Sequence, residues 1–364
     1  MGDVKRGEKL SEVRSVFILG AGFTRAFLPT APLITDDYGG ADLVEKFKGF
    51  DHASRVLDLE LSRANGQIDI ERLMTRLDGR MPYDFDQGAN EELGMLLTEV
   101  KKSLIKRIQV ARSGLVYTDE LAEFARYCVD NHLTCITFNY DDVLDEALWN
   151  VRPTYTPIGK PYWHPDGGYG FFCRPSQLSV EDTPIEMDVE TSMLLLKLHG
   201  SINWYPRRGY LKPYVVDAIM HHESWFAGFK LREATRQAIS LHMELEPFIV
   251  PPVLFKSALV EQPILRLVWH RAYDALRRAT RVTFVGYSFP TTDIAASVLF
   301  DEVLKTLPRT DIKVVNVAKS KNEKQRTRNA YQAILGPIPE EQFDLRGALD
   351  WSRDLVKGQD AIVS

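Results

Sequence analysis

The stretch SVFILGAGFTRAF, residues 15–27, runs from an apolar segment directly into Gly20-Ala21-Gly22. An unbroken apolar run of this kind is typical of a strand that is covered on both faces of a sheet. Glycine lacks a Cβ and permits positive φ, so the backbone after the strand can turn tightly or approach a bound phosphate. Two interpretations remain open for this stretch, a phosphate-binding loop and a plain strand-to-helix turn.

Four further apolar segments have the same character, at residues 134–138, 193–198, 282–285 and 312–317. The first four of the five segments end at polar or glycine-containing motifs, and the fifth carries Asn316 inside the run. These motifs are GAGFT, NYDD, HGSINW and GYSFPTTD. Ligands of open parallel sheets bind outside the carboxyl ends of the strands. We therefore predict an α/β fold with a Rossmann-like parallel sheet and one shared ligand site at this edge.

The chain between the first and second predicted strands is far longer than a simple crossover requires. Its apolar residues recur at helical spacing, and Asp or Asn precedes several of the helical segments. We therefore predict a helical insertion over residues 41–131 that covers the site or contacts a partner. The α/β domain is expected over residues 11–320, followed by a C-terminal helical extension over residues 321–364.

The composition limits the class of protein. With 364 residues, 45% of them hydrophobic, the chain can bury a large core, and its net charge of −5 argues against a dedicated nucleic-acid surface. Three cysteines are too few for a disulfide framework. The N-terminus lacks the apolar segment of a signal peptide, and no apolar stretch is long enough to cross a bilayer. We expect a soluble, cytoplasmic protein without membrane contact or direct nucleic-acid binding.

The ordered set of motifs resembles the sirtuin family of NAD-consuming enzymes. In order along the chain, the motifs are Gly20-Ala21-Gly22, Thr137-Phe138-Asn139-Tyr140-Asp141, His199-Gly200, Gly286-Tyr287-Ser288 and Asn316. The forms T-x-N-Y-D, K-L-H-G-S and G-Y-S are most similar to the prokaryotic sirtuin-like branch found in anti-phage defence. The resemblance spans residues 20–316 and implies a Rossmann-like domain that binds NAD across the carboxyl edge of the sheet.

The resemblance also implies roles for residues at that edge. NAD-binding roles fall to Gly20, Ala21, Gly22 and Thr24 at the pyrophosphate, to Gly286 and Ser288 on the other side of the dinucleotide, and to Asn316 at the adenosine ribose. Thr24 is expected to donate a hydrogen bond to the phosphates. Asp141 is expected to orient the loop or the sugar, or to cap the next helix.

Two residues are expected to act on the bond that breaks. Asn139 can donate and accept hydrogen bonds at once, which suits positioning the nicotinamide ribose and an attacking water. His199 can take a proton near neutral pH, which suits a general base. From position alone, His199 is also compatible with a structural role, and Asn139 and Asp141 with turn residues.

The chain departs from the protein-deacylating sirtuins in two respects. It contains no C-x-x-C pair, so the structural zinc module of those enzymes is absent and we expect no zinc. The G-x-P-D-F-R motif of their cofactor loop is absent as well, which puts an acyl-lysine channel in doubt. NAD is then expected as a substrate, with water or an internal nucleophile as the acceptor.

Several functions follow from this comparison. The leading hypothesis is an NAD glycohydrolase that depletes NAD as an effector of anti-phage defence. The alternatives are an ADP-ribosyl cyclase or transferase, a protein deacylase, and a regulatory subunit that binds NAD or ADP-ribose without turnover. Family resemblance further suggests a homo-oligomer and a separately encoded ATPase or nucleic-acid-guided partner.

Overall fold

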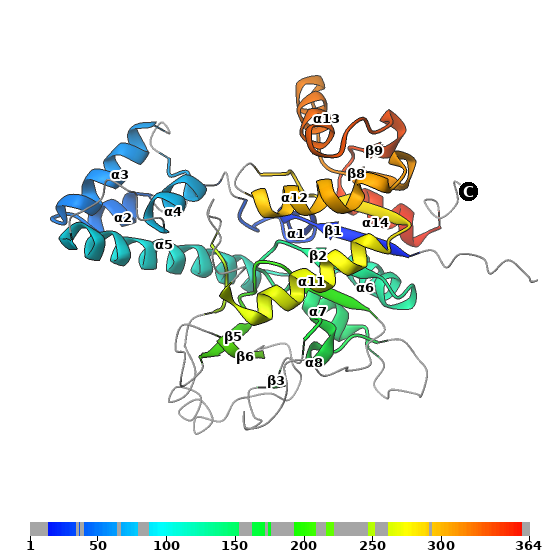
Figure 1. Cartoon of the computed structure of the whole chain (residues 1–364), viewed down its shortest axis with the longest axis horizontal. Helices are drawn as coiled ribbons and strands as arrows, with labels where there is room; N and C mark the ends of the chain where they lie inside the picture. Colours follow the sequence, from blue (N-terminus) through cyan, green and yellow to red (C-terminus); the bar gives the residue numbers. More distant parts are fainter. Residues whose placement is uncertain are drawn as a thin grey trace, which may run out of the picture.

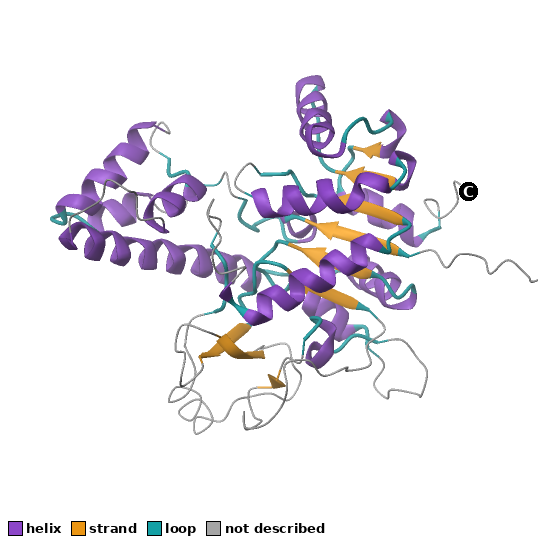
Figure 2. Ribbon diagram, in the orientation of Figure 1, coloured by secondary structure: helices purple, strands orange, loops and turns teal. Residues whose placement is uncertain are grey.

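The structure is a computed structural model. It describes residues 14–33, 36, 40–63, 67–78, 87–152, 162–171, 174–175, 193–208, 216–221, 247–251, 261–290 and 293–358. A six-stranded sheet lies at its centre (Figure 2). Its strands in chain order are β1 (Ser15–Leu19), β2 (Thr134–Thr137), β4 (Leu194–Lys197), β7 (Arg281–Val285), β8 (Ile312–Val315) and β9 (Phe343–Asp344).

The order of the strands identifies the fold class. The sheet runs β4-β2-β1-β7-β8-β9, and every adjacent pair is parallel. Numbered along the chain, this is the 3-2-1-4-5-6 order of Rossmann-type nucleotide-binding folds. The order reverses between β1 and β7, which pair in register from Ser15 opposite Arg281 to Leu19 opposite Val285. The predicted α/β fold with a Rossmann-like parallel sheet is thus confirmed, with all five predicted strands in it.

Helices cover both faces of the sheet (Figure 1). One layer contains α11 (Pro263–Arg277), α12 (Ile294–Val303) and α13 (Lys321–Leu335), which pack side by side. The other contains α1 (Ala21–Phe27), α6 (Asp119–Asp130), α7 (Val143–Asn150) and α14 (Ala348–Val356). Because both faces are covered, the strands are buried almost throughout, which explains their continuous apolar runs.

Local signals set where several helices begin. The side chain of Thr118 accepts a hydrogen bond from the amide of Leu121 and so caps α6. Ser320 and Glu323 form a capping box at the start of α13. Pro263 occupies the first turn of α11, where its missing N–H leaves no helical bond unmade.

A helical lobe stands beside the sheet (Figure 1). It consists of α2 (Gly40–Lys46), α3 (Asp51–Arg63), α4 (Ile70–Asp78) and α5 (Gln87–Ser113), which share a second apolar core. The last turn of α5 reaches the α/β domain, where Arg112 forms ion pairs with Asp142 and Glu146. Of the predicted insertion over residues 41–131, α6 does not join the lobe. It packs against α7 and α14 and covers the sheet.

The segment after residue 320 belongs to the sheet domain. We predicted a helical extension there, yet Phe343 and Asp344 pair with Val314 and Val315 as the sixth strand. Trp351 on α14 is 1% exposed and packs edge-on against Phe17 of β1, with ring centroids 5.4 Å apart. The sequence missed β9 because two residues are too short to show a strand period. Residues 359–364 lie outside the described part.

The remaining described elements are short. They are α8 (Pro165–Gly168), the 3₁₀ helices Leu304–Thr306, Arg309–Asp311 and Glu340–Gln342, and a small sheet of β3 (Arg174–Pro175), β6 (Val216–His221) and β5 (Trp204–Arg208). Within the described ranges, no helix combines the length and the apolar character that a bilayer crossing requires.

Candidate functional site

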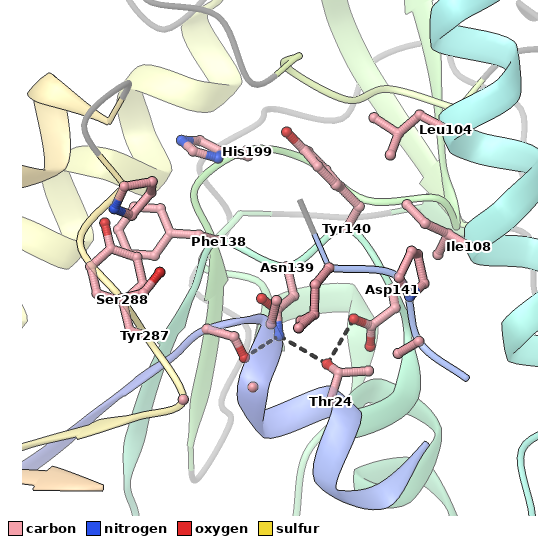
Figure 3. Close-up of a pocket in the computed structure, with 18 of the residues that line it drawn as sticks. Thr24, Leu104, Ile108, Phe138, Asn139, Tyr140, Asp141, His199, Tyr287 and Ser288 are labelled. Atoms are coloured by element: carbon pink, nitrogen blue, oxygen red, sulfur yellow. Dashed lines mark hydrogen bonds between the residues drawn. The ribbon is translucent and has the colours of Figure 1, made fainter. Parts of the chain in front are cut away.

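A cavity of about 320 Å³ lies at the carboxyl edge of the sheet, beside the point where the strand order reverses. Its volume is within the range of small-molecule sites. All ten residues for which the sequence predicted a site role line it. They are Gly20, Ala21, Gly22, Thr24, Asn139, Asp141, His199, Gly286, Ser288 and Asn316. Figure 3 labels Thr24, Asn139, Asp141, His199 and Ser288 among them. The structure therefore brings the whole predicted set together, whereas their individual roles stay predictions.

The three glycines at the strand ends interlock. The amide of Gly20 donates to the carbonyl of Val285 at 3.0 Å, and the amide of Gly22 donates to the carbonyl of Gly286 at 2.9 Å. A Cβ on Gly20 would lie 2.5 Å from the oxygen of Gly286, and one on Gly286 would lie 2.2 Å from the nitrogen of Phe23. These glycines are thus required because two loops touch through their backbones.

This packing shows a structural role for the loop at Gly20-Ala21-Gly22, which the sequence left open as a phosphate-binding loop or a plain turn. Gly20 has φ −108°, so it needs no left-handed conformation, whereas Gly286 has φ +63°. The amide of Gly22 is already bonded to Gly286. Within Gly20-Ala21-Gly22, the candidate phosphate-binding loop, Ala21 is the residue that is exposed on the cavity wall. The loop therefore joins β1 to the G-Y-S loop as well as lining the cavity.

Asn139 is held by a chain of hydrogen bonds. Its Nδ2 donates to the carbonyl of Gly20 and to Oγ1 of Thr24, both at 2.9 Å. Thr24 in turn donates to Oδ2 of Asp141 at 2.8 Å (Figure 3). Because both amide hydrogens of Asn139 are used within the protein, its Oδ1 remains to accept from a ligand. The hydroxyl hydrogen of Thr24, which we expected at the phosphates, is directed to Asp141 instead.

Asp141 joins this chain to α7. Its Oδ1 accepts from the amide of Val143, the first residue of that helix, at 3.1 Å. This is the helix-start contact that the sequence left open as one alternative for Asp141. Burial raises the pKa of Asp141, although the Lys197 ammonium and the Thr24 hydroxyl act in the opposite direction.

A buried lysine supports the same loop. Lys197, at the end of β4, is 0% exposed, and its Nζ lies 3.1 Å from Oδ2 of Asp145 on α7. The ammonium also donates to the backbone carbonyl of Asp141. Tyr169 and Asn203 donate to the Asp145 carboxylate. Lys197 was not among the residues predicted from the sequence, although a lysine inside an apolar strand, two residues before His199, is a usable signal.

His199 enters the cavity from the loop after β4. It is 5% exposed and packs against Phe138, with ring centroids 5.2 Å apart. Gly200 has φ +79°, and a Cβ there would lie 2.1 Å from the oxygen of Phe248, so only glycine permits the sharp turn. Trp269 of α11 donates to the carbonyl of Leu198 at 2.9 Å and supports the strand end.

The structure adds Asp293 to the predicted set. This aspartate is 2% exposed, and its Oδ1 lies 3.6 Å from Nε2 of His199. Its Oδ2 accepts from the hydroxyl of Tyr287 at 3.3 Å. Asp293 is the last residue of the motif GYSFPTTD, yet it was not among the site residues predicted from the sequence. Its position in a motif at a strand end was the signal available.

The G-Y-S side of the cavity contains two predicted polar residues. Asn316 donates through Nδ2 to the carbonyl of Tyr287 at 3.2 Å, and its Oδ1 accepts from the amide of Val317 at 2.9 Å. Its side chain therefore fixes the loop of Tyr287. Ser288 is exposed on the cavity wall, so its hydroxyl is accessible to a ligand.

The helical lobe forms the facing wall. Leu104 and Ile108 of α5 point into the cavity (Figure 3), and Ile70 and Glu71 of α4 also line it. Among the described lining residues, the carboxylates are Glu71, Asp141 and Asp293, and none is a lysine or arginine. Across the described ranges, no group of three His, Cys, Asp or Glu side chains could hold a metal ion.

Comparison of the sequence with protein-family models and with curated proteins gave no match. Among solved structures, the chain is similar to the one titled "Structure of Sir2Tm bound to a propionylated peptide". The identity is 11% and the TM-score is 0.36, over 95% of this chain and 93% of that chain. A likeness at this level carries no argument about function, and the fold assignment rests on the strand order.

Proposed function

We propose that this protein is an NAD glycohydrolase, which cleaves NAD with water to nicotinamide and ADP-ribose. One observation carries the proposal: ten residues from motifs spread over residues 20–316 line one cavity where the strand order of a Rossmann-type sheet reverses. Dinucleotides bind at this position in such sheets. Parallel pairing brings the four motifs to one edge of the sheet, and their polar side chains line one cavity there.

The reaction requires charge stabilisation and a proton acceptor. As the N-glycosidic bond breaks, its electron pair leaves with nicotinamide, and positive charge develops on the ribose. The carboxyl groups of Glu71, Asp141 and Asp293 line the described cavity wall, and an ionised carboxylate beside the ribose would favour that transition state. No base is needed to expel nicotinamide, because it departs from the pyridinium as a neutral molecule.

The water step falls to two residues in this proposal. Asn139 accepts through Oδ1 from a ribose hydroxyl or from the attacking water, since its Nδ2 is already bonded to Gly20 and Thr24. The water oxygen bonds to the anomeric carbon, and His199 takes the proton that the water loses. The locked amide of Asn139 limits its motion, which supports catalysis by orientation.

The first experiment incubates the purified chain with NAD and identifies the products by chromatography and mass spectrometry. His199→Ala is expected to reduce ADP-ribose formation by about 10² to 10⁴-fold, because the attacking water loses its general base. Asn139→Ala is expected to reduce it as well, because the ribose or the water loses its acceptor. Asn131→Ala and His270→Ala are the matched controls, because both residues are exposed and neither lines the cavity. Circular dichroism checks that each variant is folded.

The outcomes separate the candidate functions. Nicotinamide together with ADP-ribose supports the hydrolase, and a cyclic or transferred ADP-ribose product supports the cyclase or transferase. Release only in the presence of an acyl-lysine peptide supports the deacylase. Tight NAD binding without turnover, unchanged in His199→Ala, supports the regulatory subunit and contradicts the hydrolase.

We further propose that the activity acts in anti-phage defence and is held in check until a partner or self-assembly releases it. The defence role is proposed from the motif resemblance, and the restraint because an unregulated NAD hydrolase would drain the NAD of its own cell. The test compares the NAD content of infected bacteria that carry the wild-type gene or Asn139→Ala. An equal decline of NAD in both strains would contradict the defence role.

A further inference from the structure

We infer that Asp293 is the positioning residue for His199: its carboxylate faces Nε2, favours the tautomer with the hydrogen on Nε2 and favours the protonated form of the imidazole. The catalytic consequence of this pairing rests on the proposed function, whereas the pairing itself does not. Neither the motif resemblance nor the predicted site residues include Asp293.

The position of Asp293 in the chain makes its orientation informative. It occupies the N-cap of α12, where an aspartate side chain commonly accepts from an amide of the first helical turn. Here the side chain makes no capping hydrogen bond to that helix. Its two oxygens are directed instead at two side chains of the cavity wall, Tyr287 and His199. The Asp293 side chain therefore contacts residues of the cavity wall and does not cap the helix.

Burial of the Asp293 carboxylate costs free energy unless its charge is compensated. A carboxylate that is 2% exposed is strongly destabilised unless donors or a cation compensate it. Burial, and then the nearby Asp293 carboxylate, raise the pKa of Tyr287 well above its ordinary value, so the phenol stays protonated and donates. The bond from Tyr287 holds Oδ2 of Asp293, which leaves Oδ1 on the side of His199.

The effect on His199 follows from charge. Its Nε2 lies 3.6 Å from Oδ1, which is longer than a hydrogen bond but close enough for a strong attraction to an imidazolium. A hydrogen on Nε2 leaves the lone pair on Nδ1, the nitrogen that then accepts the proton. The carboxylate stabilises the imidazolium that results, so it increases the basicity of His199.

Other groups also surround the imidazole. The rings of Phe138, Tyr140 and Trp269 lie 5.2, 6.3 and 6.5 Å from it, centroid to centroid. Among the described residues, Tyr140 and Asp293 lie against the imidazole, and Tyr287 donates to Asp293. Lys197 ends the strand two residues before His199, and Glu71 acts on Tyr287 from the lobe. Within this set, Asp293 is the carboxylate whose oxygen lies within 4 Å of the ring.

The chain offers a matched control pair. On α11, Nε2 of His270 also lies 3.6 Å from a carboxylate oxygen, that of Asp274. The two pairs differ in burial, because the side chains of His270 and Asp274 are 68% and 32% exposed, against 6% and 3% for His199 and Asp293. Water screens the exposed pair, so the same substitution should have little effect there.

The test is a histidine titration by NMR on the full chain, with signals assigned from His199→Gln and His270→Gln. Asp293→Asn is expected to lower the pKa of His199 by about one unit or more, and the same titration of Asp274→Asn is the exposed control. Asp293→Glu, which keeps the charge, should restore much of the shift. For an active chain, the acid limb of the kcat/KM profile should move with the measured pKa.

A second measurement uses the wild-type chain, in case Asp293→Asn does not fold. Nitrogen shifts of the ¹⁵N-labelled histidines should show neutral His199 with its hydrogen on Nε2. The hydrogen on Nδ1, or an unchanged pKa of His199 in Asp293→Asn, would overturn the proposal. If the pKa shifts as expected but the chain never hydrolyses NAD, the pairing is correct and the proposed function is wrong.

Discussion

Replacing the buried lysine of β4 tests how the site loop is supported. In Lys197→Met the aliphatic stem stays and the ammonium is lost. Asp145 is left as a buried carboxylate, and the carbonyl of Asp141 loses its donor. We expect this change to destabilise the fold and to loosen the segment that carries Asn139.

The magnitude follows from the distance and the burial. At 3.1 Å and an effective dielectric constant of about 20, the attraction between the two charges is about 5 kcal/mol. Desolvation of both groups in the intact pair offsets much of that gain, but removing one partner leaves the other charge buried, which typically costs about 3 to 5 kcal/mol. Tyr169 and Asn203 still donate to Asp145, so we expect a loss near the lower limit, about 3 kcal/mol.

Urea unfolding followed by tryptophan fluorescence measures this loss. Trp163 and Trp204 are suitable reporters because their rings lie 5.3 and 5.1 Å from the ring of Tyr169, beside the ion pair. The control is Lys48→Met, whose partner Glu45 is 79% exposed, and its expected cost is below about 0.5 kcal/mol.

A double variant sharpens the test. Lys197→Met with Asp145→Asn removes both charges, so it should be clearly more stable than the sum of the two single losses predicts. A loss in Lys197→Met that is no larger than in the Lys48→Met control would refute the reasoning. Strict additivity in the double variant would refute the pairing of the two charges.

Three further predictions follow from the same cavity. Gly286→Ala should abolish NAD binding and lower the free energy of unfolding by several kcal/mol, because φ is +63° and the added Cβ would lie 2.2 Å from a backbone nitrogen. The control Gly94→Ala, in open space on α5, should instead stabilise the fold by about 1 kcal/mol. Urea unfolding of both variants measures the two effects. Burial raises the pKa of Asp141, so the neutral carboxyl favours folding and this contribution is lost as pH rises from about 4 through the raised value. The unfolding free energy of wild type minus that of Asp141→Asn should therefore fall over that window, and a difference that rises with pH would contradict the shift. Leu104→Trp should fill the cavity wall and weaken NAD binding in calorimetry, whereas Val110→Trp on the 63% exposed face of α5 should not, and equal affinities would place the ligand elsewhere.

Much of the fold was predictable because its signals are local. Each of the five apolar runs became a strand of the sheet, since a run of this length and composition has few other stable uses in an α/β domain. The crossover helix α6 was predicted as a helix but assigned to the insertion. Helical periodicity shows that a face is buried and does not show which core buries it.

For the candidate site, the residues were predictable from the sequence but their hydrogen bonds were not. Gly20, Asn139 and His199 were identified from motifs at strand ends, and parallel strands necessarily bring those ends to one edge. The use of each polar atom was not predictable. Both amide hydrogens of Asn139 are consumed by partners 119 and 115 residues away, and Thr24 donates across 117 residues to Asp141. Hydrogen bonds between residues so far apart in the sequence depend on the strand order and on how the loops pack.

The sequence by itself determined that the chain folds as an α/β protein whose polar motifs gather at the carboxyl edge of its sheet. Strand runs and the residues that follow them are adjacent in the chain, so their pattern survives without knowledge of the fold. Only the tertiary structure decided that Gly286 must be glycine because Phe23 touches it, and that Lys197 supports the Asn139 loop. It alone placed Asp293 against His199, because that pair joins elements 94 residues apart through packing, which no local pattern records.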